Sequence, residues 1–319
     1  MEPNNSSLAK KIMQHNLSHS SILGLRIALL VLHIVNSFLH GFGTFILVKI
    51  VRQKDVKPQH VFLLGLSSSE CAMNVLEAIR VIPKIATDAL TTFGKYLQIT
   101  TFSGIWLVVY LMTVYITIDR LLLIAMKVRY HKVMSKQRAI WLLSTTWIAG
   151  GIFAFATSLA YLLFHFDWKN TYFKYFYSII DFSFIILAVV TYQYIFRRLQ
   201  ISHKRLTGEI KLPVRKSTHR LAAPERTTLT NPRTSTLHMN PWKFYRTTIL
   251  LVLTFLIFII VPDMTYLFYV VIAQKKSDGL FYACSLSYAF ANFTDVIIYL
   301  YMQPRVRKEI KRVRRMKNV

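Results

Sequence analysis

The sequence predicts an all-α membrane protein, in which a bundle of seven transmembrane helices is followed by a short amphipathic eighth helix. The chain of 319 residues is 54% hydrophobic and only 17% charged, whereas about 25% of residues are charged in a typical soluble protein. Its mean hydropathy is +0.38, although 40 Lys and Arg against 14 Asp and Glu give a net charge of +26. A nucleic-acid-binding protein can be equally basic but is not this apolar. Basic loops between apolar helices account for both properties.

Seven stretches are long enough to cross a hydrocarbon core of about 30 Å, which takes about 20 apolar residues. Three of them contain no Asp, Glu, Lys or Arg: Ile27–Val48, Tyr96–Ile118 and Ala139–Phe166. Four more qualify if each holds one or a few polar residues: 60–84, 172–196, 247–273 and 279–302. We therefore expect an N-terminal segment (1–22), a seven-helix domain (23–302) and a C-terminal segment (303–319).

The loops predict the orientation in the membrane. The segments after spans one, three, five and seven hold 30 of the 40 Lys and Arg residues, so the positive-inside rule makes them cytoplasmic and leaves the N-terminus extracellular. Three glycosylation sequons, at Asn4, Asn5 and Asn16, agree with an outer N-terminus. The longest cytoplasmic loop, 201–242, contains four prolines among many Thr, Arg and Lys residues, so we expect it to be mobile.

The C-terminal segment has a different pattern. Val306, Ile310 and Val313 recur at helical spacing among Arg and Lys residues. This spacing predicts an amphipathic helix that suits an anionic inner membrane surface, with membrane lipids as partners.

Several ionisable side chains fall inside the expected spans, where each costs about 2.5–3.5 kcal/mol on insertion scales and is a candidate site. Glu77 and Arg80 are spaced to form an ion pair within one helix. His33, Asn36 and His40 share one helical face, and we expect them to point into the bundle with a structural role. Further candidates in or at the ends of the spans are Glu70, Asp119, Arg120, Asp181, Asp263 and Asp295.

No catalytic or metal-binding motif occurs in the sequence, so we expect no enzymatic activity, no cofactor and no metal ion. The two cysteines, Cys71 and Cys284, lie in apolar stretches. We expect both to be free thiols, because neither belongs to an extracellular loop.

The motifs in the expected spans resemble those of rhodopsin-like (class A) G-protein-coupled receptors, in order and over all seven spans. Asp119-Arg120-Leu121 resembles the Asp-Arg-Tyr end of helix three, and Asp295-Val296-Ile297-Ile298-Tyr299 resembles the Asn-Pro-x-x-Tyr of helix seven. Further similarities are Glu70 for the helix-two aspartate, Val128–Met134 in the second inner loop, Trp147, Tyr192, Pro262 and Arg305–Ile310.

The departures from the family pattern resemble the melanocortin, cannabinoid, lysophospholipid and adenosine receptor branch. Lys95 stands where the family has its helix-three cysteine, Phe184 lies near the usual helix-five proline, the second outer loop is short, and Asp295 opens the helix-seven motif, as in that branch. Ile260 replaces the helix-six tryptophan, which melanocortin receptors keep, as they do the helix-seven proline. Melanocortin receptors come nearest, but their peptide-binding acids fall at Arg80, Lys95 and Ile99. The resemblance therefore implies the fold and the signalling mode, and it does not identify the ligand.

The family implies a cell-surface receptor at the plasma membrane that transmits binding of an extracellular ligand to a heterotrimeric G protein, without a nucleic-acid partner. It assigns activation and coupling to Asp119, Arg120, Tyr192, Asp295 and Tyr299, and a cation or proton site to Glu70 and Asp295. The acid that often pairs with Arg120 from helix six would fall near Trp242, which predicts raised basal activity.

For the ligand, we expect a small cation or a short peptide, because carboxylates among aromatic rings bind cations. The residues expected to contact it are Asp181, Asp263, Trp106, Phe102 and Tyr288. The alternative is a seven-span transporter or channel, which would need a continuous polar path through the bundle.

Overall fold

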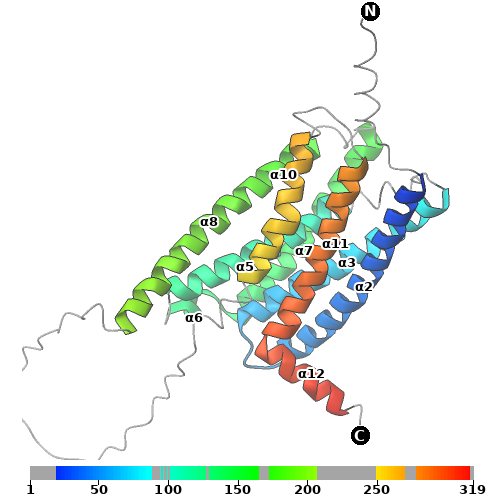
Figure 1. The fold of residues 1–319 in the computed structure, drawn as a ribbon. Helices are drawn as coiled ribbons and strands as arrows, with labels where there is room; N and C mark the ends of the chain where they lie inside the picture. Colours follow the sequence, from blue (N-terminus) through cyan, green and yellow to red (C-terminus); the bar gives the residue numbers. More distant parts are fainter. Residues whose placement is uncertain are drawn as a thin grey trace, which may run out of the picture.

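The computed structural model describes residues 19–87, 94, 96, 99, 101–126, 129–164, 172–206, 249–269 and 278–316, and the regular structure in these ranges is helical. The elements in chain order are α2 (His19–Val51), α3 (Pro58–Thr87), η1 (Thr101–Ile105), α5 (Trp106–Met126), α6 (Tyr130–Val133), α7 (Lys136–Phe164), α8 (Tyr172–Leu206), η3 (Leu256–Ile260), α10 (Val261–Leu267), α11 (Asp278–Met302) and α12 (Pro304–Met316). The long helices form one bundle, and α6 and α12 both lie at its lower end in Figure 1, which we call the α12 end.

Five segments are long and apolar enough to cross a membrane: Ser21–Val51, Ser103–Met126, Lys136–Leu163, Ile249–Leu267 and Gly279–Met302. The chain is therefore an all-α, multi-pass membrane protein. The two other predicted spans, 60–84 and 172–196, do form long helices, α3 and α8. Neither of these helices meets the same length and hydropathy test over its described residues. A total of seven crossings therefore stays a prediction.

The observed helices extend beyond several of the predicted spans. α2 begins before Ile27, and α8 continues to Leu206, ten residues past the predicted end. The sequence predicts the spans from stretches with few charged residues. A helix continues into polar residues as long as its backbone hydrogen bonds are made, so the helices are longer than the predicted spans.

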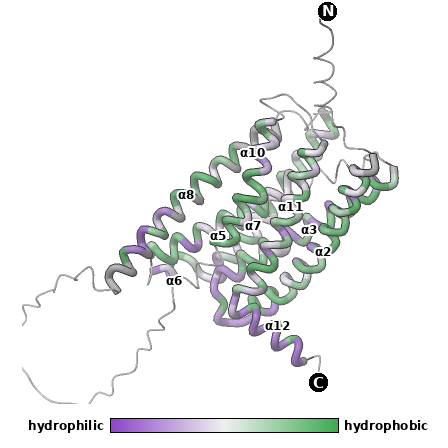
Figure 2. The backbone as a smooth tube through the Cα atoms, viewed as in Figure 1, coloured by the Kyte–Doolittle hydropathy of each residue, from purple (hydrophilic) through white to green (hydrophobic). Residues whose placement is uncertain are grey.

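The bundle has an apolar surface and a partly polar interior, as expected for a protein surrounded by lipid. Phe38 is 77% exposed, Phe155 70% and Ile179 66%. In contrast, His40 and Glu70 are buried. Figure 2 shows mainly hydrophobic helices through the bundle and a hydrophilic α12.

The largest hydrophobic cluster lies toward the α12 end. It joins Ile46 of α2, Phe62 of α3, Met112 of α5 and Val296 of α11, all of them fully buried. Val306 of α12 also belongs to it. α12 therefore forms part of the folded bundle.

The amphipathic helix that the sequence predicts at 303–319 is present as α12. Its apolar side, with Val306, Ile310 and Val313, packs against the large cluster. Arg305 Nη1 donates a hydrogen bond of 2.5 Å to the carbonyl of Asp55, which fastens the start of α12 to the loop between α2 and α3. Most of the basic side chains of α12 remain exposed.

Two π-helical segments, η1 and η3, lie within the described part of the bundle. η1 precedes α5, and η3 directly precedes the turn that holds Pro262. A proline cannot donate to the helical ladder, so a neighbouring π-turn accommodates the missing bond. The carbonyl of Pro262 accepts a hydrogen bond of 3.5 Å from Cys284 Sγ. Cys71 and Cys284 are both free thiols, as predicted.

Glycines bring η1 and α7 into close contact. A Cβ added at Gly104 would lie 2.6 Å from Ala154 Cβ and 2.8 Å from the carbonyl oxygen of Gly150. A Cβ at Gly150 would lie 2.6 Å from Val108 Cγ2. Small residues at a helix interface allow the backbones to approach, which is a main source of helix association in membranes.

We predict that Gly150→Ala destabilises the bundle, because its methyl group would force η1 and α7 apart. Overpacking of this kind costs about 1–3 kcal/mol. The matched control is Gly151→Ala, since a Cβ at Gly151 meets no atom within 4 Å. Unfolding midpoints of the purified proteins in detergent measure the difference. Equal stability of the two variants would contradict the close approach.

Candidate functional site

The first candidate site is built around Arg120 at the α12 end of α5. Arg120 is 3% exposed, and its Nη2 donates a hydrogen bond to Gln59 Oε1 at the start of α3. The same Nη2 lies 3.8 Å from Asp119 Oδ2. Asp119 also accepts a hydrogen bond from the hydroxyl of Tyr130 in α6. We call Arg120, Asp119, Gln59 and Tyr130 the arginine cluster.

The arginine cluster links three elements of the α12 end through charge-assisted hydrogen bonds, which are about twice as strong as neutral ones. Burial first, and then the neighbouring Asp119 carboxylate, raise the pKa of the Tyr130 phenol above its ordinary value. Tyr130 therefore remains a hydrogen-bond donor throughout the physiological pH range. The same Nη2 atom contacts both Asp119 and Gln59. A conformational change that moved this atom away from Asp119 would therefore also break its hydrogen bond to Gln59.

The second candidate site lies deeper in the bundle, between α2, α3 and α11. Glu70 of α3 and Asp295 of α11 are 2% and 4% exposed. His40 of α2 places Nδ1 3.1 Å from Glu70 Oε2. Tyr299 of α11 shares a hydrogen bond of 2.7 Å with Ser67 of α3. We call these five residues the polar core cluster.

Gly43 makes room for the hydroxyl of Tyr299. A Cβ at Gly43 would lie 2.3 Å from Tyr299 Oη. The phenol therefore reaches between α2 and α3, where its hydroxyl also lies 3.4 Å from His40 Nδ1. This position is available only because residue 43 of α2 has no side chain.

Buried polar residues continue from the polar core cluster toward the opposite end of the bundle. Asn74 donates to the carbonyl of Glu70 at 2.8 Å, and its Oδ1 lies 2.8 Å from His33 Nδ1. Asn36 donates to the carbonyl of Ala289 in α11 at 2.8 Å. His33, Asn36 and His40 are therefore all buried and point into the bundle, as predicted.

The predicted ion pair between Glu77 and Arg80 is present further along α3. Arg80 donates to Glu77 Oε2 through both Nε and Nη2. Both residues are buried, at 8% and 7% exposure. The pair neutralises two charges that would each be costly to bury alone.

The opposite half of the bundle contains a cluster of aromatic rings around Trp106 of α5. Its ring lies 5.3 Å from that of Tyr288 and 5.6 Å from that of Tyr110, between centroids. Tyr110 in turn contacts Phe255, which packs against Phe184 of α8 at 4.7 Å. These rings connect α5, α8 and α11 to the segment that leads into η3.

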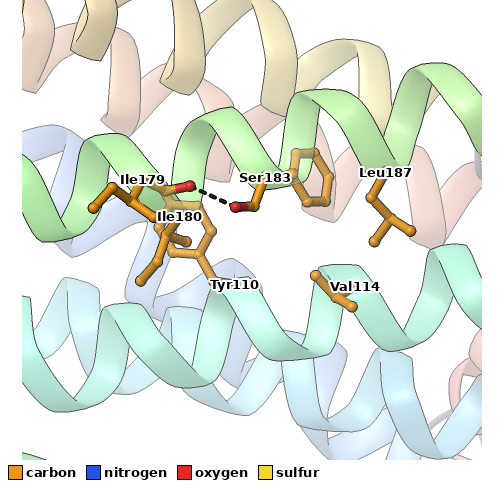
Figure 3. A pocket seen from close by; sticks show the side chains of 7 residues that line it. Tyr110, Val114, Ile179, Ile180, Ser183 and Leu187 are labelled. Carbon is orange, nitrogen blue, oxygen red and sulfur yellow. Dashed lines mark hydrogen bonds between the residues drawn. The ribbon is translucent and has the colours of Figure 1, made fainter.

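An apolar pocket of about 290 Å³ opens between α5 and α8 (Figure 3). Its lining includes Tyr110 and Val114 from α5 and Ile180 and Leu187 from α8. The hydroxyl of Ser183 donates to the carbonyl of Ile179 at 2.7 Å, so this polar group is satisfied within its own helix. The lining has the chemistry of the hydrocarbon region of a membrane and offers no anchor for a charged ligand.

Of the predicted ligand-binding residues, the structure brings together Trp106 and Tyr288. Asp263 is half-buried in the first turn of α10. Asp181 lies in α8 and Phe102 in η1, but their side chains are outside the described part of the structure, as is that of Tyr192 in α8. The glycosylation sequons at Asn4, Asn5 and Asn16 also lie outside the described residues, as do residues 207–242 of the predicted mobile loop, whereas its first six residues, 201–206, belong to α8.

Of the predicted coupling residues, the structure places Asp119 and Arg120 in the arginine cluster and Asp295 and Tyr299 in the polar core cluster. Sequence reasoning missed Gln59, Tyr130 and Ser67, and it gave His40 a purely structural role. Gln59 and Ser67 follow one another at helical spacing on the face of α3 that also holds Glu70, which is the signal that could have found them.

No family model matches the chain, and no curated protein matches it significantly. Within the described ranges, no three His, Cys, Asp or Glu side chains gather in a way that could hold a metal ion.

Proposed function

We propose that the chain is a rhodopsin-like G-protein-coupled receptor of the plasma membrane, with seven spans, an extracellular N-terminus and a cytoplasmic C-terminus. In this proposal, an extracellular ligand stabilises one arrangement of the bundle, and that arrangement exposes a groove for a heterotrimeric G protein at the α12 end. A ligand shifts the equilibrium only to the extent that it binds one state more tightly than the other.

The observation that carries the proposal is the buried Arg120, held by Asp119 and Gln59 at the α12 end. A charged side chain buried at the membrane boundary is costly, and it is retained where it has a function. Its hydrogen bond to Gln59 joins α5 to α3, so a movement of α3 relative to α5 would break this bond. The polar core cluster supplies a second set of bonds between helices, one of which involves Tyr299.

The basic residues agree with the proposed orientation. The exposed Arg and Lys residues of α12, with Lys54 and Arg52 in the segment between α2 and α3, place positive charge at the same end of the bundle as the arginine cluster. Positive charge of this kind faces the cytoplasm.

The proposal is tested in cells that express the chain with one class of heterotrimeric G protein at a time. Activation separates Gα from Gβγ, and this separation is measured by resonance energy transfer between the two. We expect separation for at least one class, with or without a ligand from a screening library. If the chain produced its signalling response in these cells without any G protein, that result would contradict the proposal.

One observation favours a second candidate, a seven-span transporter or channel. The buried polar residues form a row from Tyr299 through Glu70 and Asn74 to Arg80, as a path for protons or ions would require. Uptake by proteoliposomes that contain the purified chain distinguishes the two candidates. Solute or ion flux above that of empty liposomes would support transport.

For the ligand, we propose a small cation that contacts Asp263. We predict that Asp263→Asn lowers its potency at least tenfold, or about 1.4 kcal/mol, because the charge-assisted hydrogen bond is lost. Asp278→Asn at the start of α11 is the matched control, with unchanged potency expected. An agonist without charge whose potency is the same for the wild type and for Asp263→Asn would refute the proposed chemistry.

A further inference from the structure

His60, in the first turn of α3, is a buried histidine whose ring makes no hydrogen bond within the described part of the chain. The residue is 1% exposed, and neither Nδ1 nor Nε2 has a partner among the described residues. Buried polar side chains are nearly always satisfied by protein, by ordered water or by a bound ion. A neutral imidazole has one N–H donor and one acceptor nitrogen. The ring can therefore donate a hydrogen bond to a further group.

The charged groups that act electrostatically on His60 are all cationic. They are Arg305 of α12, Arg120 of α5 and Lys57, which directly precedes α3. Burial first, and then Arg305 and Arg120, lower the pKa of the Lys57 ammonium group below its ordinary value. Three separate elements thus bring positive charge to the same place at the α12 end.

No acidic side chain balances this charge within the described ranges. The acids at the α12 end there are Asp55, Asp119 and Glu309, and none of them is among the groups that act on His60 or Lys57. Acidic residues often occupy the first turn of a helix, where they offset its partial positive charge. The first turns of α3 and α12 hold none. The place therefore attracts anions.

An anion can reach His60 from outside the bundle. Lys57 and Arg305 are exposed, whereas His60 is buried. Arg305 donates to the carbonyl of Asp55 through Nη1, which uses one of the five N–H donors of its guanidinium group. Both exposed side chains are long and have several rotatable bonds, so they can turn to admit an anion to the imidazole. His60 then supplies a donor on the buried side, and Lys57 and Arg305 enclose the anion on the exposed side.

We propose that Lys57, His60 and Arg305 form a binding site for a phosphate group, between α12 and the segment that joins α2 to α3. A phosphate group carries enough negative charge to balance two cations and has several acceptor oxygens, which suit the forked guanidinium group and the imidazole N–H. Its source is the headgroup of an anionic phospholipid or a soluble phosphate compound. The site goes beyond the general attraction of α12 to an anionic membrane, because it requires named residues at the start of α3.

Nitrogen NMR of isotopically labelled histidine detects binding at His60 in the purified full-length chain, and His60→Gln assigns the signal. One sample, in phosphatidylcholine nanodiscs, is titrated with inorganic phosphate against sodium chloride of equal ionic strength. In a second series, a rising fraction of the lipid is phosphatidylinositol bisphosphate. We expect a saturable shift of the His60 signal with at least one probe, and the probe that binds identifies the source. No saturable shift with either probe would overturn the proposal.

A pair of double variants separates a defined site from general attraction between opposite charges. Lys57→Gln/Arg305→Gln is expected to lower the affinity for the bound probe by about tenfold or more, because charge-assisted hydrogen bonds are lost. The matched control, Arg312→Gln/Arg314→Gln, removes the same charge from exposed positions further along α12. We expect this control to bind nearly as tightly as the wild type. Equal weakening by the two double variants would show that only general attraction is present.

Two single variants keep the test independent of the Arg305 bond to Asp55. Lys57→Gln leaves that bond in place, and His60→Phe keeps a ring but removes both nitrogen atoms. A ligand that binds the folded chain raises its unfolding midpoint, so this rise replaces the NMR signal. We expect a smaller rise in both variants than in the wild type, and an equal rise in all three proteins would contradict the site. These measurements use no G protein, so they do not depend on the proposed receptor function.

Discussion

Replacement of Arg120 by alanine is expected to abolish G-protein activation while most of the protein still reaches the cell surface. The guanidinium group is the buried charge that connects α5 to α3 through Gln59 and that faces Asp119. In the proposed mechanism, the guanidinium group exchanges its hydrogen-bond partners when the α12 end opens. Alanine can form neither the bonds made before opening nor those made after it. Surface labelling and Gα–Gβγ separation, measured on the same cells, give the ratio of signal to receptor.

Arg138→Ala is the matched control for this variant. Arg138 lies at the same end of the bundle, is exposed, and donates to the carbonyls of Lys132 and Val133 at 2.8 and 2.6 Å. We expect only a small loss of signal per receptor, since the bonds of Arg138 are local and solvent-exposed. Unchanged G-protein activation in Arg120→Ala would remove the arginine cluster from the mechanism.

The largest effect on stability is expected for Arg80→Met. Arg80 is the partner of the buried Glu77 carboxylate, and the variant would leave that charge unpaired in the bundle. Breaking a buried ion pair from one side costs about 3–5 kcal/mol. Unfolding midpoints of the purified proteins in detergent, or the yield of folded protein where the variant is too unstable, measure the loss.

The double variant Glu77→Gln/Arg80→Met provides the internal control, because it removes both charges. We expect it to recover most of the lost stability, since replacement of a whole buried pair by neutral side chains is often close to neutral. If the single and double variants are equally unstable, the loss comes from packing around Arg80 and not from the unpaired charge of Glu77.

The sequence predicted the helical class and the position of most helices. It could do so because a helix that crosses the hydrocarbon core needs a long apolar run, and such runs are visible in the sequence. The limits of this signal appear at α3 and α8. Both are long helices, but polar residues such as Glu70 and Glu77 reduce the apolar character of α3. Such a helix fits a membrane only when its polar side is covered by neighbouring helices, and hydropathy does not include neighbours.

The sequence identified many residues of the candidate sites but not the contacts between them. Helical spacing placed His33, Asn36 and His40 on one face of α2, and the structure confirms that this face is buried. It could not pair His40 with Glu70, because spacing along one helix does not fix the register of the next. Gln59 and Tyr130 lie 61 and 11 positions from their partners Arg120 and Asp119, so no local pattern connects them.

The central claim is that the chain activates a heterotrimeric G protein, and guanine-nucleotide exchange on purified components tests it most directly. The full-length chain in lipid nanodiscs is mixed with each class of heterotrimer, and the rate of nucleotide exchange on Gα is compared with that in empty nanodiscs and with Arg120→Ala. We predict faster exchange for at least one class without any ligand, since no acid at position 242 pairs with Arg120, and no acceleration by Arg120→Ala. Exchange rates for the wild type that equal those of empty nanodiscs with every class would contradict the claim.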